Sequence, residues 1–297
     1  MQVSHGNLQT HSLALRAPAD VDTMTLTPMI KRISAGFSAL LLAACSATPP
    51  APVPALEDEP DFGILWVRDA AEWEALALQA YNTATRDLPR LRDDRTWSAL
   101  PDQGRAADLP PAIIVDVDET MVSNVHFQLS FEPPFANYKL DDWNAANPSL
   151  AVPGAPGFIN FALDSGVTVF YVTNRPCEPK AGVADPCPQE RTTVDDLNES
   201  GIPADERTVM MSHEQPDWKR EKKVRRDLIA ESYRVIMLIG DDLGDFIPCV
   251  RRRAVAPCTE GATAGSRRAL TREHSAYWGN GWYVLPNPMH GSWTSAE

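Results

Sequence analysis

The sequence predicts an α/β protein with a doubly wound, Rossmann-like parallel sheet and a small cap inserted after the first strand. Three apolar segments support this prediction: Ala112–Val115, Val167–Thr173 and Tyr233–Ile239. Short apolar runs of this kind are typical of strands that are buried on both faces. Segments with helical spacing separate them, and such alternation indicates parallel strands that end at one edge of the sheet.

The remaining elements are assigned from residue spacing and from helix start and stop signals. Apolar residues at helical spacing predict an amphipathic helix over Asp61–Leu88, and Pro89 is expected to interrupt it. Further elements are expected in this order: helices Ala155–Asp164 and Gln189–Ser200, strand Thr208–Met211, helix Asp217–Glu231, and a last strand with a Pro-stiffened turn within Trp282–Met289. Most of the positive charge between 217 and 231 is expected on a solvated face, although one lysine could turn inward.

The segment from about 121 to 152 has no regular period and is long for a plain loop. Long insertions are usually functional, and its place directly after an acidic turn predicts a small cap over a site. Its aromatic residues are Phe127, Phe131, Phe135, Tyr138 and Trp143. These rings can form a local core or a stacking surface for a flat substrate, and Trp143 is the best stacking candidate.

Residues 1–44 are expected to be an N-terminal extension that ends in a secretion signal. Lys31 and Arg32 precede the apolar stretch Ile33–Ala44, which is too short to span a bilayer. The stretch resembles the lipobox of bacterial lipoproteins, in which the cysteine that follows, here Cys45, carries the lipid. The alternative is an ordinary signal peptide with an incidental cysteine.

The N-terminal pattern also predicts where the protein acts. Lipidation would anchor it to the membrane of the cell envelope, and Ser46 favours the outer membrane, facing the periplasm or the surface. Residues 45–61 are rich in Pro and Ala and would form an extended tether. Residues 62–297 would then form the folded domain.

Four further cysteines lie in two local pairs: Cys177 with Cys187, and Cys249 with Cys258. Four cysteines allow three pairings, and the sequence does not choose among them, although proximity favours these two. A zinc site would require tighter spacing, and an exported protein meets an oxidising space in which disulfides persist.

Polar side chains stand at the end of each long strand: Asp116 and Asp118, Thr173 and Asn174, Asp241 and Asp245. They are expected to converge, because the carboxyl ends of parallel strands share one edge. Paired carboxylates can divide a reaction between attack and proton transfer, and can also hold Mg²⁺ through their oxygen atoms. The alternative is a set of strands that end in solvated acids.

Other classes of protein are disfavoured. The net charge of −13 argues against a nucleic-acid partner, although a small phosphorylated substrate can bind where cations gather locally. The chain has no GxxxxGK[ST] loop, Gly-x-Ser-x-Gly elbow or HExxH pair. The histidines after Cys45 are expected at the surface or in packing: His126, His213, His274 and His290.

These strand ends resemble the haloacid dehalogenase superfamily of phosphohydrolases, and more narrowly the class C acid phosphatases, also described as 5′-nucleotidase lipoproteins. The likeness runs from about Ile64 to Trp293. It rests on DVDET followed by Asn124, Trp143 ten residues before Pro153-Gly154, the YVTNR strand end, the segment from Lys222 to Arg226, GDDLGDF, and the terminal LPNPMHGSW.

The resemblance implies a role for each matching residue. Asp116 would be the nucleophile that forms an aspartyl-phosphate, and Asp118 would protonate the leaving oxygen and then activate water. The phosphoryl group would be bound by Thr173, Asn174 and Lys222, with Lys219 or Lys223 as alternatives to Lys222. Mg²⁺ would be held by Asp116, the backbone carbonyl of Asp118, and Asp241, while Asp245 supports the metal or orients the lysine.

The predicted function is that of an exported, Mg²⁺-dependent phosphomonoesterase acting on small phosphomonoesters, nucleoside monophosphates among them. One alternative is a phosphotransferase that uses the same intermediate. Another is a non-catalytic surface lipoprotein that retains the fold; the presence of both Asp116 and Asp118 counts against it.

Overall fold

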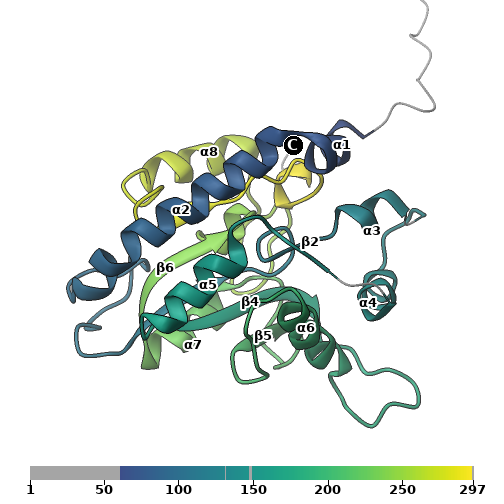
Figure 1. The fold of residues 1–297 in the computed structure, drawn as a ribbon, viewed down its shortest axis with the longest axis horizontal. Helices are drawn as coiled ribbons and strands as arrows, with labels where there is room; N and C mark the ends of the chain where they lie inside the picture. Colours follow the sequence, from purple (N-terminus) through teal and green to yellow (C-terminus); the bar gives the residue numbers. More distant parts are fainter. Residues whose placement is uncertain (1–60, 131, 147–148, 296–297) are drawn as a thin grey trace, which may run out of the picture. The chain divides into compact units, whose positions relative to one another are not determined.

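The computed structural model describes residues 61–130, 132–146 and 149–295 (Figure 1). The predicted signal segment, Cys45, nearly all of the tether and Phe131 lie outside the described residues. Among the helices that are described, none combines the length and the apolar character needed to cross a membrane.

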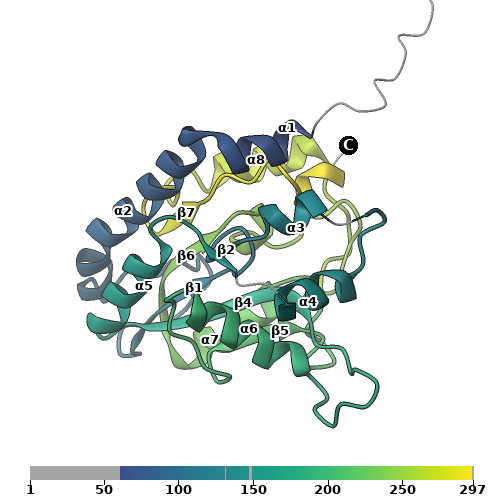
Figure 2. The ribbon, with the colours of Figure 1, turned by 45° about the vertical axis from the view of Figure 1, so that its right-hand side comes forward.

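A five-stranded parallel sheet lies at the centre of the domain, in the order β5-β4-β1-β6-β7 (Figures 1 and 2). The strands are β1 (Pro111–Val115), β4 (Thr168–Pro176), β5 (Val209–Ser212), β6 (Arg234–Gly240) and β7 (Trp282–Val284). The two strands with the strongest apolar runs, β1 and β6, are neighbours in the middle of the sheet, where both faces are covered. The predicted α/β fold with a parallel, Rossmann-like sheet is therefore confirmed.

Helices cover both faces of the sheet. They are α1 (Phe62–Asp69), α2 (Ala71–Asp93), α5 (Ala155–Asp164), α6 (Pro188–Glu199), α7 (Lys223–Ser232) and α8 (Ala264–Glu273). Ile113 and Val115 of β1 point into a core shared with α2, α5 and α6. Ile114 points to the opposite face, into a core shared with α7 and α8. This alternation follows from the period of two along a strand and makes the sheet doubly wound.

The helix predicted over Asp61–Leu88 begins as expected but differs from the structure in two places. The chain forms two helices, because Ala70 is extended and ends α1. Pro89 does not interrupt α2, which continues to Asp93. Proline inside a helix costs about 3 kcal/mol, but Leu88 and Leu91 on either side of it are fully buried and offset that cost by packing on the sheet.

The segment expected to form a cap folds into β2 (Val122–Ser123), α3 (Val125–Ser130), α4 (Asn137–Ala146) and β3 (Leu150–Ala151). β2 and β3 pair in antiparallel fashion, so the insertion leaves and returns to the sheet at the same place. In Figures 1 and 2, α3 and α4 lie to one side of the sheet, apart from α2 and α5.

Candidate active site

The ends of β1 and β6 bring Asp116 and Asp245 to opposite sides of one lysine. Lys222 Nζ lies 2.5 Å from Asp116 Oδ1 and 2.6 Å from Asp245 Oδ1. All three side chains are almost completely shielded from solvent. Burial opposes the charge of the ammonium, but the two carboxylates together hold the pKa of Lys222 above its ordinary value. Lys222 therefore provides a fixed, buried positive charge between Asp116 and Asp245.

The structure distinguishes the three candidate lysines. Lys222 alone of them reaches the carboxylates at the strand ends within the described chain. Lys223 points outward and pairs with Asp227 on the same helix, at 2.7 Å. Lys219 is exposed, and its backbone carbonyl accepts a hydrogen bond from Arg225.

The third acidic residue at this edge is Asp241, which follows β6. Ligand atoms of Asp116, Asp241 and Asp245 all lie within 4.8 Å of one another. Asn287 donates to Asp241 Oδ2 at 2.7 Å, and the Thr120 hydroxyl lies 3.5 Å from Oδ1. Burial and the charges of Asp116 and Asp245 hold the pKa of Asp241 well above its ordinary value. Negative charge at this point is therefore in excess of what Lys222 neutralises.

The excess of negative charge on Asp116, Asp241 and Asp245 indicates whether these residues suit a metal ion. Burial and the charge of Asp116 raise the pKa of Asp245 to about 6, although Lys222 acts in the opposite direction. Carboxylate oxygens are the ligands that Mg²⁺ prefers, and a divalent cation would stabilise the ionised forms of all three acids. The residues that are present thus fit a hard divalent cation.

Asp118 faces the same edge but has different partners. Arg175 donates to Asp118 Oδ1 from Nε at 3.0 Å and from Nη2 at 2.9 Å, and Asn124 donates at 2.8 Å. Burial disfavours the ionised carboxyl, but Arg175 and the hydrogen bond from Asn124 hold the pKa of Asp118 below its ordinary value. Asp116 and Asp118 therefore occupy distinct electrostatic environments although one residue separates them.

Arg175 was not assigned a role from the sequence. It is 5% exposed and links Asp118 to α6, where Nη1 donates to Asp196 at 2.8 Å. With its amide oriented to suit its neighbours, Asn144 of α4 accepts from Arg175 at 3.2 Å. Arg175 thus joins the strand edge to the cap, and its position directly after Thr173-Asn174 was the only sequence signal for it.

Thr173 and Asn174, predicted to bind phosphate, lie at this end of β4. The Thr173 hydroxyl accepts from the backbone N–H of Arg175 at 3.0 Å and lies 3.5 Å from Asp118 Oδ2. The Asn174 side-chain oxygen accepts from Arg225 at 3.0 Å, and Asn174 lines the cavity described below. Thr173 therefore lies beside Asp118, and Asn174 lines the same cavity as Asp116 and Asp118.

The helix predicted over Asp217–Glu231 begins later, at Lys223, and its positive charges are not all solvated. Arg225 is fully buried and donates to the backbone carbonyls of Thr173 and Met210. Arg226, also buried, donates to the carbonyls of Gly244 and Asp245 at 2.9 and 2.8 Å. Arginine provides several donors in a fixed plane, so these two side chains tie α7 to the strand ends.

A cavity of about 450 Å³ opens in front of the strand ends, within the size range of small-molecule sites. Its lining includes Asp116, Asp118 and Asp241 on the sheet side, and Phe135 and Leu140 from the cap segment. Phe135 is half exposed. Trp143 is not among the residues that line the cavity; its ring lies 6.1 Å from that of the buried Phe127, so its predicted stacking role stays a prediction.

The C-terminal loop completes the site, which the sequence analysis did not anticipate. His290 was expected at the surface or in packing, yet it lines the cavity, and its Nε2 lies 2.9 Å from the buried Glu119. Ser292 donates to Asp242 from its backbone N–H at 2.6 Å and from its hydroxyl at 2.7 Å. Together with Asn287 on Asp241, the loop holds three acidic side chains in place. Histidine spacing could not reveal this, because the contact depends on a chain reversal after β7.

The close approach of Asp245 to Gly240 explains why the GDDLGDF segment begins with glycine. A Cβ at position 240 would lie 2.2 Å from Asp245 Oδ2 and 2.5 Å from Asp245 Cβ. Asp245 can therefore approach the end of β6, and reach Lys222, only because residue 240 has no side chain.

Two disulfides are present, Cys177–Cys187 and Cys249–Cys258, the pairing that proximity favoured. Each closes a loop next to the cavity: the first follows Arg175, and the second follows Phe246. The second loop contributes Arg251 to the lining of the cavity, and Pro176, directly before the first loop, also lines it.

The fold and the site together define an α/β protein with a parallel sheet, in which acidic side chains that fit a divalent cation and a buried lysine share one sheet edge. Comparison with known proteins identifies the family to which the chain belongs. The model of the haloacid dehalogenase superfamily, subfamily IIIB (acid phosphatase), matches residues 69–293. A class C acid phosphatase from Bacillus anthracis has a similar structure, with 26% identity, a TM-score of 0.61, and coverage of 79% of this chain and 86% of that one.

The same Bacillus anthracis enzyme with tungstate bound matches with a TM-score of 0.63 at the same identity and coverage. The chain therefore belongs to the acid phosphatases of subfamily IIIB in the haloacid dehalogenase superfamily. Its reaction class is that of a phosphoric monoester hydrolase.

Proposed function

We propose that this phosphatase hydrolyses small phosphomonoesters through a covalent phosphoryl intermediate on Asp116, with Mg²⁺ as its metal. The observation that supports this most strongly is the pairing of Asp116 with Lys222 at 2.5 Å beside Asp241 and Asp245. A carboxylate repels a phosphoryl dianion unless cations offset the charge; Lys222 is one such cation, and the acidic cluster would hold a metal ion as another.

In the first step, an Asp116 oxygen attacks phosphorus, and the bond from phosphorus to the leaving oxygen breaks. Lys222 stabilises the charge on the phosphoryl oxygens, and Asp118 donates a proton to the leaving alcohol. Asp118 must be protonated to do so, and its pKa is held low by Arg175, which favours turnover at acid pH.

In the second step, water attacks phosphorus of the aspartyl-phosphate while Asp118, now ionised, takes a proton from that water. The bond from Asp116 to phosphorus breaks and phosphate is released. The pair with Arg175 favours the ionised form that this step requires. A single carboxyl group thus acts first as acid and then as base.

Asp116 and Asp241 would hold the Mg²⁺ ion, with Asp245 and the main-chain carbonyl of Asp118 beside them. When bound, the ion supplies positive charge for the transferring phosphoryl oxygens. The Bacillus anthracis relative has been solved with tungstate bound, and since tungstate is a tetrahedral oxyanion, this supports the proposal that the present phosphatase also binds a phosphate-like oxyanion.

The leaving group would lie in the cavity, against Phe135 and Leu140 of the cap segment. An apolar wall opposite polar catalytic groups suits a planar organic group, so 5′-mononucleotides are included among the proposed substrates.

The test is Asp116→Asn, assayed by phosphate release from p-nitrophenyl phosphate and a nucleoside 5′-monophosphate. Activity should fall by about a thousandfold or more, because the amide is a poor nucleophile. Asp195→Asn, an exposed carboxyl on α6, serves as the control and should retain activity. Undiminished turnover by Asp116→Asn would remove the nucleophile assignment.

The same assay separates the alternatives. Transfer of the phosphoryl group to an added alcohol, in place of release to water, would indicate a phosphotransferase. No turnover of any phosphomonoester by the wild-type protein, with Mg²⁺ and at several pH values, would indicate a binding protein that retains the fold.

We further propose that the protein is exported and lipid-anchored through Cys45 at the outer membrane. Support comes from the basic and apolar run that precedes Cys45 and from the two disulfides, which persist in oxidising compartments. Replacing Cys45 by Ser should release the protein from the membrane fraction and abolish incorporation of labelled fatty acid. Equal membrane recovery of both proteins would contradict the anchor.

A further inference from the structure

Two arginines at the cavity have no part in the catalytic steps described above. Arg220 and Arg251 both line it. Within the described residues, neither forms an ion pair with a carboxylate at 4.0 Å or less. Asp242, which lines the cavity as well, already accepts hydrogen bonds from Gly244 and from Ser292. The other cavity arginine, Arg175, is by contrast fully engaged by Asp118 and Asp196.

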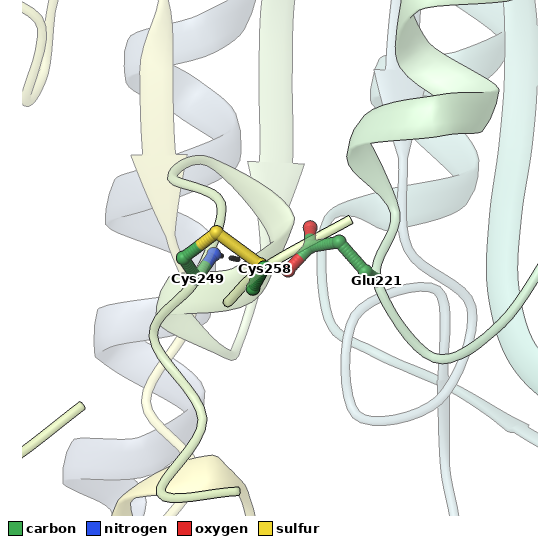
Figure 3. Close-up of side chains that lie close together, drawn as sticks. All are labelled: Glu221, Cys249 and Cys258. Atoms are coloured by element: carbon green, nitrogen blue, oxygen red, sulfur yellow. Dashed lines mark hydrogen bonds between the residues drawn. A yellow bond between two sulfur atoms is a disulfide. The ribbon is translucent and has the colours of Figure 1, made fainter. Parts of the chain in front are cut away.

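Arg251 belongs to a loop whose backbone is held at each successive residue. Cys249 is cross-linked to Cys258, and its backbone N–H donates to Glu221 Oε2 at 3.0 Å (Figure 3). The Val250 carbonyl accepts from Arg267 at 2.6 Å. The Arg251 carbonyl accepts from the backbone N–H of Ala262 at 2.8 Å. This dense support fixes the start of the Arg251 side chain before any ligand arrives.

Glu221 connects this loop to the catalytic lysine. Its carboxylate is buried and points toward the disulfide in Figure 3. One oxygen accepts from Cys249 and the other from the backbone N–H of Lys223 at 3.1 Å. Arg220 and Lys222 flank Glu221 in the chain, so the hydrogen bonds of Glu221 tie the segment that carries both to the disulfide loop of Arg251. The sulfur atoms near Glu221 are bonded to each other and are not available as metal ligands.

Arg220 and Arg251 carry positive charge in a protein whose net charge is −13 and in a cavity that is also lined by acidic side chains. Acidic side chains at the strand ends would repel any anion on the leaving group of a substrate. Guanidinium groups without ion-pair partners in the described chain offset this repulsion, and their planar donors suit phosphate and similar oxyanions. Because the loop that carries Arg251 is preorganised, less backbone entropy is lost there when an anion binds.

We propose that Arg220 and Arg251 form a second anion subsite, so that the preferred substrates are phosphomonoesters carrying another phosphate-like group on the leaving group. This inference rests on the proposed function, since it concerns the leaving group of the same hydrolysis. One guanidinium comes from the segment before Lys222 and the other from the disulfide loop, so the second anion binds between the two segments.

The test compares phenyl phosphate with 4-(phosphonomethyl)phenyl phosphate, in which the phosphonate is not hydrolysed. The wild-type protein should show a higher kcat/KM for the phosphonate-bearing substrate. Arg251→Ala should lower the ratio of the two kcat/KM values by about tenfold, and Arg220→Ala/Arg251→Ala should lower it further. Arg252→Ala removes an equal charge from an exposed position of the same loop and should leave the ratio unchanged.

Arg251→Lys provides a second variant that keeps the charge and should retain part of the preference. Thermal unfolding of each variant reports whether the loop is intact. The subsite is overturned if a folded Arg251→Ala variant keeps the wild-type ratio of the two kcat/KM values. An equal fall in both kcat/KM values leaves that ratio unchanged and would overturn the subsite as well. Failure to hydrolyse either substrate would instead contradict the proposed function, so the two failures are distinguishable.

Discussion

Lys222 is the residue on which the electrostatics of the site depend. Its ammonium is buried between Asp116 and Asp245, and those carboxylates hold its pKa above the ordinary value. It is therefore charged at neutral and acid pH, and its removal would leave two buried carboxylates without their counter-ion. Loss of one member of a buried charged pair is costly because the other remains unpaired.

Lys222→Ala should lower kcat/KM by about a hundredfold or more, because charge stabilisation of the phosphoryl group is lost. Lys223→Ala removes the neighbouring charge, whose ion pair with Asp227 is at the surface, and should change kcat/KM by less than about twofold. Steady-state kinetics with p-nitrophenyl phosphate measures both. Comparable losses in the two variants would contradict the assignment of the phosphate-binding lysine.

Gly240→Ala should displace Asp245, because the new Cβ would overlap its carboxylate. We expect a loss of about 2 kcal/mol in the free energy of unfolding together with reduced activity, since Asp245 could no longer pair with Lys222 as it does. Gly104→Ala is the matched control, because a Cβ at that position meets no atom within 4 Å. Urea denaturation measures both variants, and equal stabilities would refute the close approach.

At the scale of elements, α6 carries a carboxyl group that opposes folding at neutral pH. Burial and the charges of Glu214, Glu206 and Asp185 raise the pKa of Glu190 to about 7. Ionisation in the folded state is therefore less favourable than in the unfolded chain. The resulting destabilisation is absent below pH 4.5 and grows as the pH rises toward 7.

Glu190→Gln should thus raise Tm at pH 8 and have little effect at pH 4. Glu190 is partly exposed, so solvent screening limits the gain to about 1 kcal/mol or less, equivalent to about 2 °C in Tm. Calorimetric scans at the two pH values measure the difference. A stabilisation that is equal at both values would show that the charge of Glu190 is not responsible.

The bounds of helices with clear start and stop residues were predicted closely from the sequence. Helix α5 spans Ala155–Asp164 as its sequence indicates, and Gly166 after it has a φ of 75°, a conformation that glycine adopts readily. Pro89 was misjudged because burial on the sheet outweighs local propensity. Helix α7 was placed too early, because Glu221 and Lys222 are held by contacts with the disulfide loop and the strand ends, and not by a helical turn.

For the whole molecule, the excess of negative charge at the strand ends predicts a metal-dependent stability. Added Mg²⁺ should raise Tm, because an ion that binds only the folded state stabilises it by about 2.7 kcal/mol at a hundred times its Kd. Asp241→Asn should abolish most of this shift, and a chelator should reverse it in the wild-type protein. Thermal unfolding in NaCl at the same ionic strength is the control for electrostatic screening by salt. A shift that is equal in Asp241→Asn would place the ion elsewhere.

The whole molecule also decides which side chains meet. Asp116, Asp118, Asp241 and Asp245 could be proposed from their place at strand ends. The burial of Arg225 and Arg226 could not, because the charge pattern of a surface helix and that of a buried one are similar. The contacts of Arg175 and His290 could not either, because no local pattern reveals them. Their roles depend on contacts between segments that are far apart in the chain, such as Glu119 with His290.

The sequence by itself determined the parallel sheet and the residues at its strand ends, because burial on both faces and helix boundaries leave local patterns. The tertiary structure decided which lysine meets Asp116, how the C-terminal loop holds the acids, and which arginines face the cavity. These depend on the distance between segments and on the space that side chains leave one another, and neither is encoded in a local period.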